Sequence, residues 1–106
     1  MRIVGVTACP TGIAHTYMAA TRLSNAARVL HYEIKIETQG AMGVENALSA
    51  KDIANADVVV IAADIPIRDE KRFAQARIIK TTTREAINDP NGILLQAVEL
   101  LGVKQA

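Results

Sequence analysis

Short apolar runs alternate along the chain with longer segments that have helical spacing. Residues 2–8 (RIVGVTA) and 57–63 (DVVVIAA) are nearly continuous apolar runs, which is the pattern of strands buried on both faces. Residues 32–38 alternate apolar and charged side chains and predict a half-buried strand at a sheet edge. A brief fourth strand is expected around Ile78 and Ile79.

The segments between these strands favour helices. Residues 13–30 place four apolar side chains on one helical face: Ala19, Leu23, Ala26 and Leu30. Ser49 is expected to cap a short helix that runs to Asn55. The remaining helical segments are 70–75 (a short turn), 81–88 and 93–101, with a break at the Asp-Pro-Asn-Gly run of residues 89–92. Residues 39–44 and 64–69 are expected to be loops.

The order of these elements predicts an α/β fold. Strands that alternate with helices form a parallel sheet with helices on both faces, and we expect an open four-stranded sheet in a three-layer, Rossmann-like arrangement over a single domain, residues 1–106. Right-handed crossovers and an edge position for residues 32–38 favour the strand order 2-1-3-4. Ligands bind where the carboxyl ends of strands one and three meet. Cys9 follows strand one, and Asp64 follows strand three.

Composition narrows the class of protein. Half of the residues are apolar, 22% are charged and the formal net charge is +1, so the bulk charge gives no attraction for nucleic acid or an anionic membrane. One Phe, two Tyr and no Trp leave little for stacking on single-stranded nucleic acid. No apolar run reaches membrane-spanning length, and the opening run is too short for a signal-peptide core.

The single cysteine excludes an internal disulfide and a Cys-x-x-Cys redox pair. One cysteine and two separated histidines make no ligand cluster, so no metal site and no cofactor are expected. A lone thiol is typical of a protein in the reducing cytosol.

The most informative stretch is residues 9–16 (CPTGIAHT), between a buried strand and a helix start. The first N–H groups of a helix lack intrahelical partners and form an anion site together with the helix dipole. Gly12 allows a turn that aims further N–H groups at the same point, and Thr11 and Thr16 add hydroxyl donors.

Cys9 at the mouth of such a loop suits phosphoryl chemistry. A thiol at a helix N-terminus has a lowered pKa, and a phosphoryl group on its sulfur would lie where the donors point. Free cysteines are also among the most often buried residues. The residues alone therefore leave a catalytic and a structural Cys9 as equal alternatives.

Several polar residues near this loop are candidates for the site. His15 is interpreted as a donor to the phosphoryl group or a group that tunes the thiolate, and the alternative is a local hydrogen bond at the helix start. Asp64 and Gln39 are candidates for the rim, although Asp64 is equally well explained as an ordinary loop residue. Gly40 is expected to form a turn.

Other residues are expected at the surface or in the core. The basic cluster of residues 68–77 is interpreted as a solvated surface, with attraction of an acidic partner or of the phosphoryl group as the alternative; its members are Arg68, Lys71, Arg72 and Arg77. Met18 is expected in the core, Met42 is a candidate for partner contact, and His31 is expected at the surface beyond a helix C-terminus.

At this point the sequence resembles a known family. Residues 9–16 resemble the active-site loop of fructose-type IIB domains of bacterial sugar phosphotransferase systems. The similarity continues through Glu37-Thr38-Gln39-Gly40 with Gly43 and Asn46, through Asp52-Ile53, Ala56-Asp57 and Ala62-Ala63-Asp64, and through Arg72-Phe73 and Glu85-Ala86-Ile87. The resemblance covers nearly the whole chain, and the loop motif is long and specific.

The resemblance implies a phosphoryl carrier. A phosphohistidine on a IIA domain donates to Cys9, the phosphocysteine donates to a sugar such as fructose held by a membrane IIC permease, and residues 10–16 bind the phosphoryl group: Pro10, Thr11, Gly12, Ile13, Ala14, His15 and Thr16. The carrier is then a cytoplasmic phosphotransferase at the inner face of the cell membrane. Its length suggests a separate subunit or an excised domain.

Three other functions fit the sequence less well. Low-molecular-weight phosphatases also use a Cys loop after strand one, but an Arg ends their loop where this sequence has His15, so hydrolysis should be poor. A thiol redox protein would need a resolving cysteine. A nucleotide-binding module would need a G-x-G-x-x-G or Gly-Lys-Thr/Ser loop.

Overall fold

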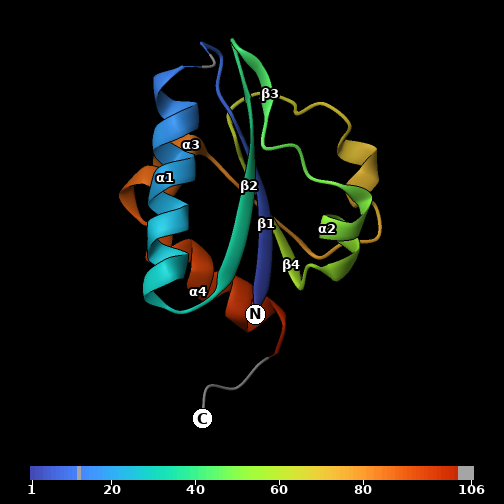
Figure 1. The fold of residues 1–106 in the computed structure, drawn as a ribbon. Coiled ribbons are helices and arrows are strands. Elements are labelled where there is room, and N and C mark those ends of the chain that lie inside the picture. Colours follow the sequence, from blue (N-terminus) through green and yellow to red (C-terminus); the bar gives the residue numbers. More distant parts are fainter. Residues whose placement is uncertain (12, 103–106) are drawn as a thin grey trace.

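The computed structural model describes residues 1–11 and 13–102, and its described part contains one five-stranded sheet of order β3-β2-β1-β4-β5 (Figure 1). The strands are β1 (Arg2–Ala8), β2 (Glu33–Gly40), β3 (Gly43–Glu45), β4 (Val58–Ala63) and β5 (Ile78–Thr81). All neighbours are parallel except β3, which runs antiparallel to β2. The predicted α/β class and the order of the four parallel strands are confirmed.

The short edge strand β3 corrects the prediction. The sequence predicts a loop over residues 39–44 and an edge position for β2, but β2 extends to Gly40 and pairs with β3 across a two-residue turn at Ala41 and Met42. Gly43 has φ +93°, a backbone conformation that favours glycine. Three residues are too few to show a period of two, so hydrophobic alternation gave no signal for this strand.

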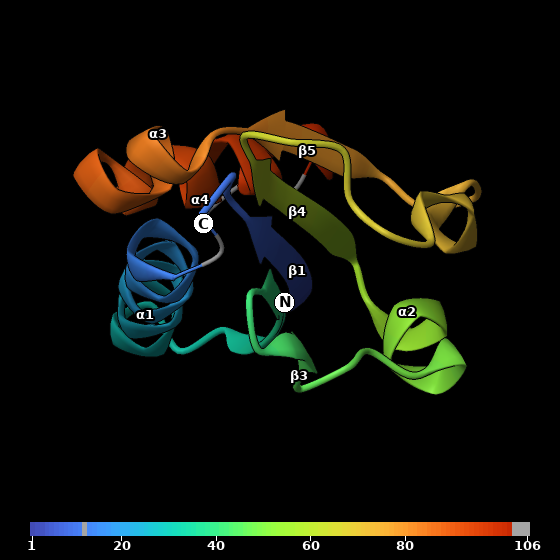
Figure 2. The same cartoon turned by 90° about the horizontal axis from the view of Figure 1, so that it is seen from above.

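Helices cover both faces of the sheet, as predicted (Figure 2). One layer contains α1 (Ala14–Val29), α3 (Thr83–Asn88) and α4 (Pro90–Leu100), and the other contains α2 (Ala50–Asn55) and the 3₁₀ helix η1 (Glu70–Phe73). A hydrophobic core lies on each face of the sheet, and alternate residues of β1 and β4 point into one core or the other. Ile3 and Val58 pack with the α1 layer, whereas Val4 and Val59 pack with Phe73 of η1.

The buried face of α1 differs from the expected one. Its buried residues are Thr16, Ala19, Leu23 and Ala27, whereas Leu30 is exposed beyond the last helical turn. The prediction that Met18 lies in the core is wrong, because the residue is 49% exposed. Met18 immediately precedes the buried Ala19, and one residue turns a helix by about 100°, which carries Met18 off the sheet-facing side.

The shorter helices begin where side chains cap them. Ser49 accepts a hydrogen bond from the Asp52 N–H at the start of α2 and so acts as the predicted cap. The expected break is confined to Asp89, which ends α3 and begins α4. Residues 90–92 form the first turn of α4, because Asp89 accepts from the Gly92 N–H and Pro90 occupies the first helical position. Within residues 1–11 and 13–102, no helix is both long and apolar enough to cross a lipid bilayer.

Candidate active site

Cys9 directly follows β1, the central strand of the sheet. The residue is only 2% exposed. Strands β2 and β4 flank β1 on either side, and the Asp64 N–H donates to the Ala8 carbonyl oxygen at 3.0 Å just beyond the ladder. The cysteine therefore lies at the carboxyl end of the strand at which the strand order reverses direction. Open α/β sheets bind ligands at this point.

Two threonine hydroxyls contact the sulfur of Cys9. Thr16 Oγ1 donates to Sγ at 3.1 Å, and Thr11 Oγ1 lies 3.5 Å from Sγ. Thr16 is fully buried in the first turn of α1, and its carbonyl oxygen accepts from Thr7 Oγ1 at 2.9 Å. The start of α1 is thus fixed to β1 beside the cysteine. The Thr16 hydroxyl thereby places a hydrogen-bond donor beside the sulfur.

The start of α1 has no side-chain cap among the described residues. Ile13 occupies the N-cap position, and its apolar side chain makes no capping hydrogen bond. Ala14 and His15 are exposed in the first turn. The N–H groups of this turn consequently face outward without a side-chain cap from the described residues, and they favour negative charge. Gly12 lies outside the described residues, so its predicted role in the loop stays a prediction.

Cys9 opens onto a cleft of about 290 Å³. Three segments line it: the end of β1 with the loop after it, the end of β2 with the turn into β3, and the loop after β4. The lining residues are Ala8, Cys9, Pro10, Thr11, Gln39, Gly40, Ala41, Gly43, Ile65, Pro66 and Arg68. These segments gather at the upper end of the sheet in Figure 1. Arg68 is the one charged side chain among these lining residues.

The two rim candidates occupy different places. Gln39 lines the cleft, as expected. Asp64 does not belong to the described lining: its Oδ1 accepts from the Thr83 N–H at 3.0 Å and its Oδ2 from Thr83 Oγ1 at 2.6 Å. The carboxylate of Asp64 therefore joins the end of β4 to the start of α3. His15 is also outside the cleft lining, so its contact with a phosphoryl group stays a prediction.

A buried ion pair beside the cleft has no counterpart in the sequence-based expectations. The alternation in β2 predicts an outward-facing Glu37, but the residue is 1% exposed, and Arg72 binds its carboxylate with two hydrogen bonds. Arg72 is thus not the solvated surface residue that the sequence predicts. No local pattern pairs the two residues, which are 35 positions apart.

The environment of Glu37 keeps it ionised. Burial raises the pKa of its carboxyl group, but hydrogen bonds from Arg72, Gln39 and the Leu48 N–H outweigh burial and hold this pKa below its ordinary value. A buried carboxylate with this many donors is stable as an anion and fixes the direction of each donor.

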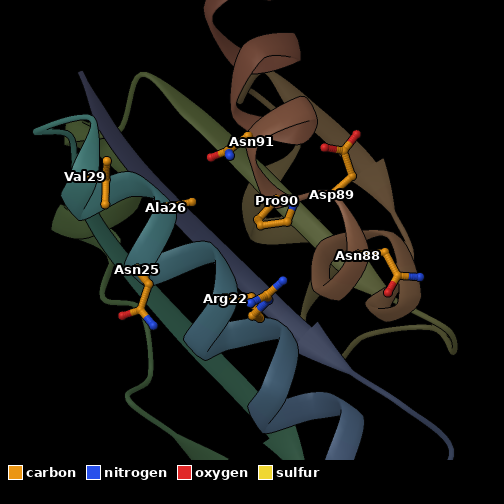
Figure 3. Close-up of a pocket in the computed structure, with 8 residues that line it drawn as sticks. All are labelled: Arg22, Asn25, Ala26, Val29, Asn88, Asp89, Pro90 and Asn91. Carbon is orange, nitrogen blue, oxygen red and sulfur yellow. The ribbon is translucent and has the colours of Figure 1, made fainter.

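A second hollow, of about 330 Å³, lies between the later part of α1 and the α3–α4 junction (Figure 3). Its lining residues are Arg22, Asn25, Ala26, Val29, Asn88, Asp89, Pro90 and Asn91. Arg22 Nε donates to the Ile87 carbonyl oxygen at 3.0 Å, which ties α1 to α3. This lining contains no cysteine or histidine. The described chain also holds no group of three His, Cys, Asp or Glu side chains placed to bind a metal ion.

Comparisons with known proteins place the chain in a family. The family model described as "PTS system, Lactose/Cellobiose specific IIB subunit" matches residues 4–96. A "PTS system fructose-like EIIB component 2" from Escherichia coli K12 is 46% identical over 93 residues, 88% of each chain. A "PTS system fructose-specific EIIB'BC component" from Xanthomonas campestris is 48% identical over 102 residues, which are 96% of this chain and 17% of that protein.

Solved structures give the same family. A domain from the fructose-specific IIABC component of Borrelia burgdorferi has a TM-score of 0.88 at 48% identity, with 92% of this chain and 93% of that chain covered. An Enzyme IIB subunit of the PTS system from Escherichia coli K12 has a TM-score of 0.89 at 39% identity, with 95% and 94% covered. Phosphoryl transfer fits these relatives, and they do not favour the phosphatase alternative. The chain therefore belongs to the PTS IIB family, as a fructose-type EIIB component.

Proposed function

We propose that Cys9 carries the phosphoryl group and that the chain accepts it from a phosphohistidine on a IIA domain. The observation that supports this most directly is the placement of the Cys9 sulfur, 3.1 Å from the Thr16 hydroxyl, at the uncapped start of α1 and on a cleft. Transfer of a phosphoryl group depends mainly on position and on stabilisation of charge, and this arrangement offers both.

The transfer has two steps. The thiolate of Cys9 attacks phosphorus, an S–P bond forms, the P–N bond of the phosphohistidine breaks and the electron pair returns to the imidazole nitrogen. In the second step a hydroxyl oxygen of the sugar attacks phosphorus and loses its proton to solvent, and the S–P bond breaks to release the thiolate. Thr11, Thr16 and the first N–H groups of α1 hold the phosphoryl oxygens between the steps.

The acceptor in this proposal is a sugar bound by a membrane IIC permease, with fructose as the first sugar to test. Relatives named EIIB'BC and IIABC support it, since their names join IIB to other components in one protein. The carrier would work at the cytoplasmic face of the membrane, beside IIC. The fructose-type phosphotransferase activity expected of the chain rests on the same relatives.

Exposed apolar side chains support docking of partners around Cys9. Met42 in the β2–β3 turn is 82% exposed, Ile13 before α1 is 60% exposed and Ile65 on the cleft is 39% exposed. A partner that presents its phosphohistidine to the cleft would cover these side chains.

The experiment that tests the proposal is intact-mass measurement after incubation with phosphoenolpyruvate, the two general phosphotransferase proteins and a fructose-type IIA. We expect one added phosphoryl group, which is absent in Cys9→Ala and Cys9→Ser. Circular dichroism should show that both variants stay folded. Full phosphorylation of either variant would contradict the mechanism, and release of phosphate from an aryl phosphate without added mass would assign a phosphatase instead.

The same assay tests His15. We expect His15→Ala to slow phosphorylation of Cys9 severalfold without abolishing it, because the threonine hydroxyls and the α1 N–H groups remain. An unchanged rate would assign His15 a structural role at the start of α1.

A further inference from the structure

Arg68 has an unusual place in the Cys9 cleft. It is the one charged residue among the described lining residues, and it comes from the loop after β4 rather than from the loop that carries the cysteine. The structure gives its guanidinium no hydrogen bond or ion pair within residues 1–11 and 13–102, and the residue is exposed. With no partner in this described part of the chain, the guanidinium is available to bind an anion in the cleft.

The backbone of Arg68 is held by a side chain from β2. Gln39 Oε1 accepts from the Arg68 N–H at 2.8 Å, and Gln39 Nε2 donates to the Arg68 carbonyl oxygen at 3.2 Å. This pair of hydrogen bonds binds residue 68 as a neighbouring strand would. It fixes the point from which the Arg68 side chain starts.

The Gln39 amide is itself fixed by the buried ion pair. Its Nε2 also donates to Glu37 Oε2 at 2.8 Å, and the carboxylate of Glu37 is held in turn by Arg72. An amide that bonds on both sides cannot rotate without losing these partners. The contacts from Arg72 through Glu37 to Gln39 therefore hold in place the part of the cleft wall that contains Arg68.

We propose that Arg68 contacts the phosphoryl group on Cys9 and that Gln39 is the positioning residue that holds it there. This rests on the proposed carrier function of Cys9. A guanidinium pairs with two phosphate oxygens at once and keeps its charge at all accessible pH values. It neutralises the phosphoryl group during transfer and favours the dianion of the phosphocysteine between transfers.

The first test is ³¹P NMR of the phosphorylated protein across pH 4 to 9, with Arg68→Gln and the control Arg77→Gln, which removes the same charge outside the cleft. We expect the second ionisation of the phosphocysteine in Arg68→Gln to move to higher pH by about half a unit, the size of a unit charge roughly 5 Å away in water. Arg77→Gln should leave it unchanged.

The outcomes separate this inference from the carrier function. A protein that never becomes phosphorylated on Cys9 contradicts the carrier function itself. A phosphocysteine that forms normally and titrates identically in wild type and Arg68→Gln overturns only the role of Arg68.

The second test is the rate of phosphorylation by phospho-IIA as a function of donor concentration. Arg68→Gln should lower kcat at least about tenfold with little change in KM, and Arg68→Lys should restore part of it. A raised KM with unchanged kcat would mean that Arg68 binds an acidic partner surface, which contradicts the proposal.

The role of Gln39 needs a double variant. If Gln39 acts through Arg68, the single variant Gln39→Leu should slow transfer and shift the ³¹P titration. In a protein that already carries Arg68→Gln, the same substitution should cause little further change in either measurement. If Gln39→Leu does not fold, Gln39→Asn replaces it in this test, because it keeps the amide group on a shorter side chain. Fully additive effects of Gln39 and Arg68 substitutions would show that Gln39 acts on something other than Arg68.

Discussion

At the scale of single residues, Thr16 holds a hydroxyl group beside the sulfur of Cys9. It donates to Sγ while its own carbonyl oxygen is held by the hydroxyl of Thr7, so its position depends on β1 as well as on α1. Thr11 approaches the same sulfur from an exposed position and is less restrained.

We expect Thr16→Val to slow alkylation of Cys9 by iodoacetamide severalfold at pH 7, because the thiolate loses a hydrogen-bond donor. Thr16→Ser keeps the hydroxyl and should react nearly as fast as wild type. Equal rates for the valine and serine variants would show that the hydroxyl does not stabilise the thiolate.

The carboxyl group of Glu37 makes the stability of the folded protein depend on pH. Its carboxyl pKa is lowered in the folded protein from the ordinary value of 4.5, so folding favours the ionised form. The stabilisation from this group is therefore complete well above pH 4.5 and is lost as pH falls through the lower folded-state pKa.

We expect Glu37→Gln to lower the free energy of unfolding by about 3 kcal/mol at pH 7, because it leaves Arg72 without its anionic partner. The deficit relative to wild type should shrink at pH 3, and urea unfolding at the two pH values measures it. The control is Glu33→Gln, because its exposed pair with Arg2 should contribute little to stability. A deficit that is the same at both pH values would contradict the ionic role.

At the scale of elements, Asp64 connects the end of β4 to the start of α3. Its two carboxylate oxygens accept from the N–H and the hydroxyl of Thr83, which is 1% exposed. The sequence left Asp64 as a candidate for the rim of the site or an ordinary loop residue, and in the fold its hydrogen-bond partner is Thr83 at the start of the next helix.

We expect Asp64→Asn to lower the free energy of unfolding by about 1–2 kcal/mol, because the amide has a single acceptor oxygen for two donors. The rate of Cys9 phosphorylation should change less than twofold. Thr83→Val, which removes the hydroxyl and keeps the backbone N–H, should destabilise similarly. A stable Asp64→Asn protein with severalfold slower transfer would place Asp64 at the site after all.

The elements that were predictable are those whose pattern is local. The apolar runs of β1 and β4 and the N-cap at Ser49 each depend on neighbouring residues, and all three were predicted correctly. The ion pair of Glu37 with Arg72 depends on which loops meet across the sheet. No spacing in the sequence contains that information, so Gln39 could be predicted at the cleft but the ion pair that supports it could not.

At the scale of the whole molecule, exposed apolar side chains lie at both ends of α1, but only one end adjoins the cysteine. Ile13 precedes α1 beside the Cys9 loop, and Met42 lies in the turn whose flanking residues line the cleft. Val29, at the last turn of α1, is 77% exposed and lines the other hollow.

We expect Met42→Glu to raise the KM for phospho-IIA severalfold, because a charge replaces an apolar contact in the docked complex. Val29→Glu is the matched control at the far end of α1 and should leave KM unchanged. The free energies of unfolding of both variants should lie within about 0.5 kcal/mol of the wild-type value. Equal effects of the two substitutions, or none, would place the donor elsewhere on the surface.

The central place of β1 has a consequence for motion. Amide protons in such a strand, bonded on both sides and covered by two cores, exchange with solvent only when the whole domain opens. Cys9 is the next residue along the chain, so its backbone continues directly from a strand that we expect to open slowly. If Cys9 carries the phosphoryl group, as proposed, we therefore expect the donor and the acceptor each to approach a sulfur that stays in place.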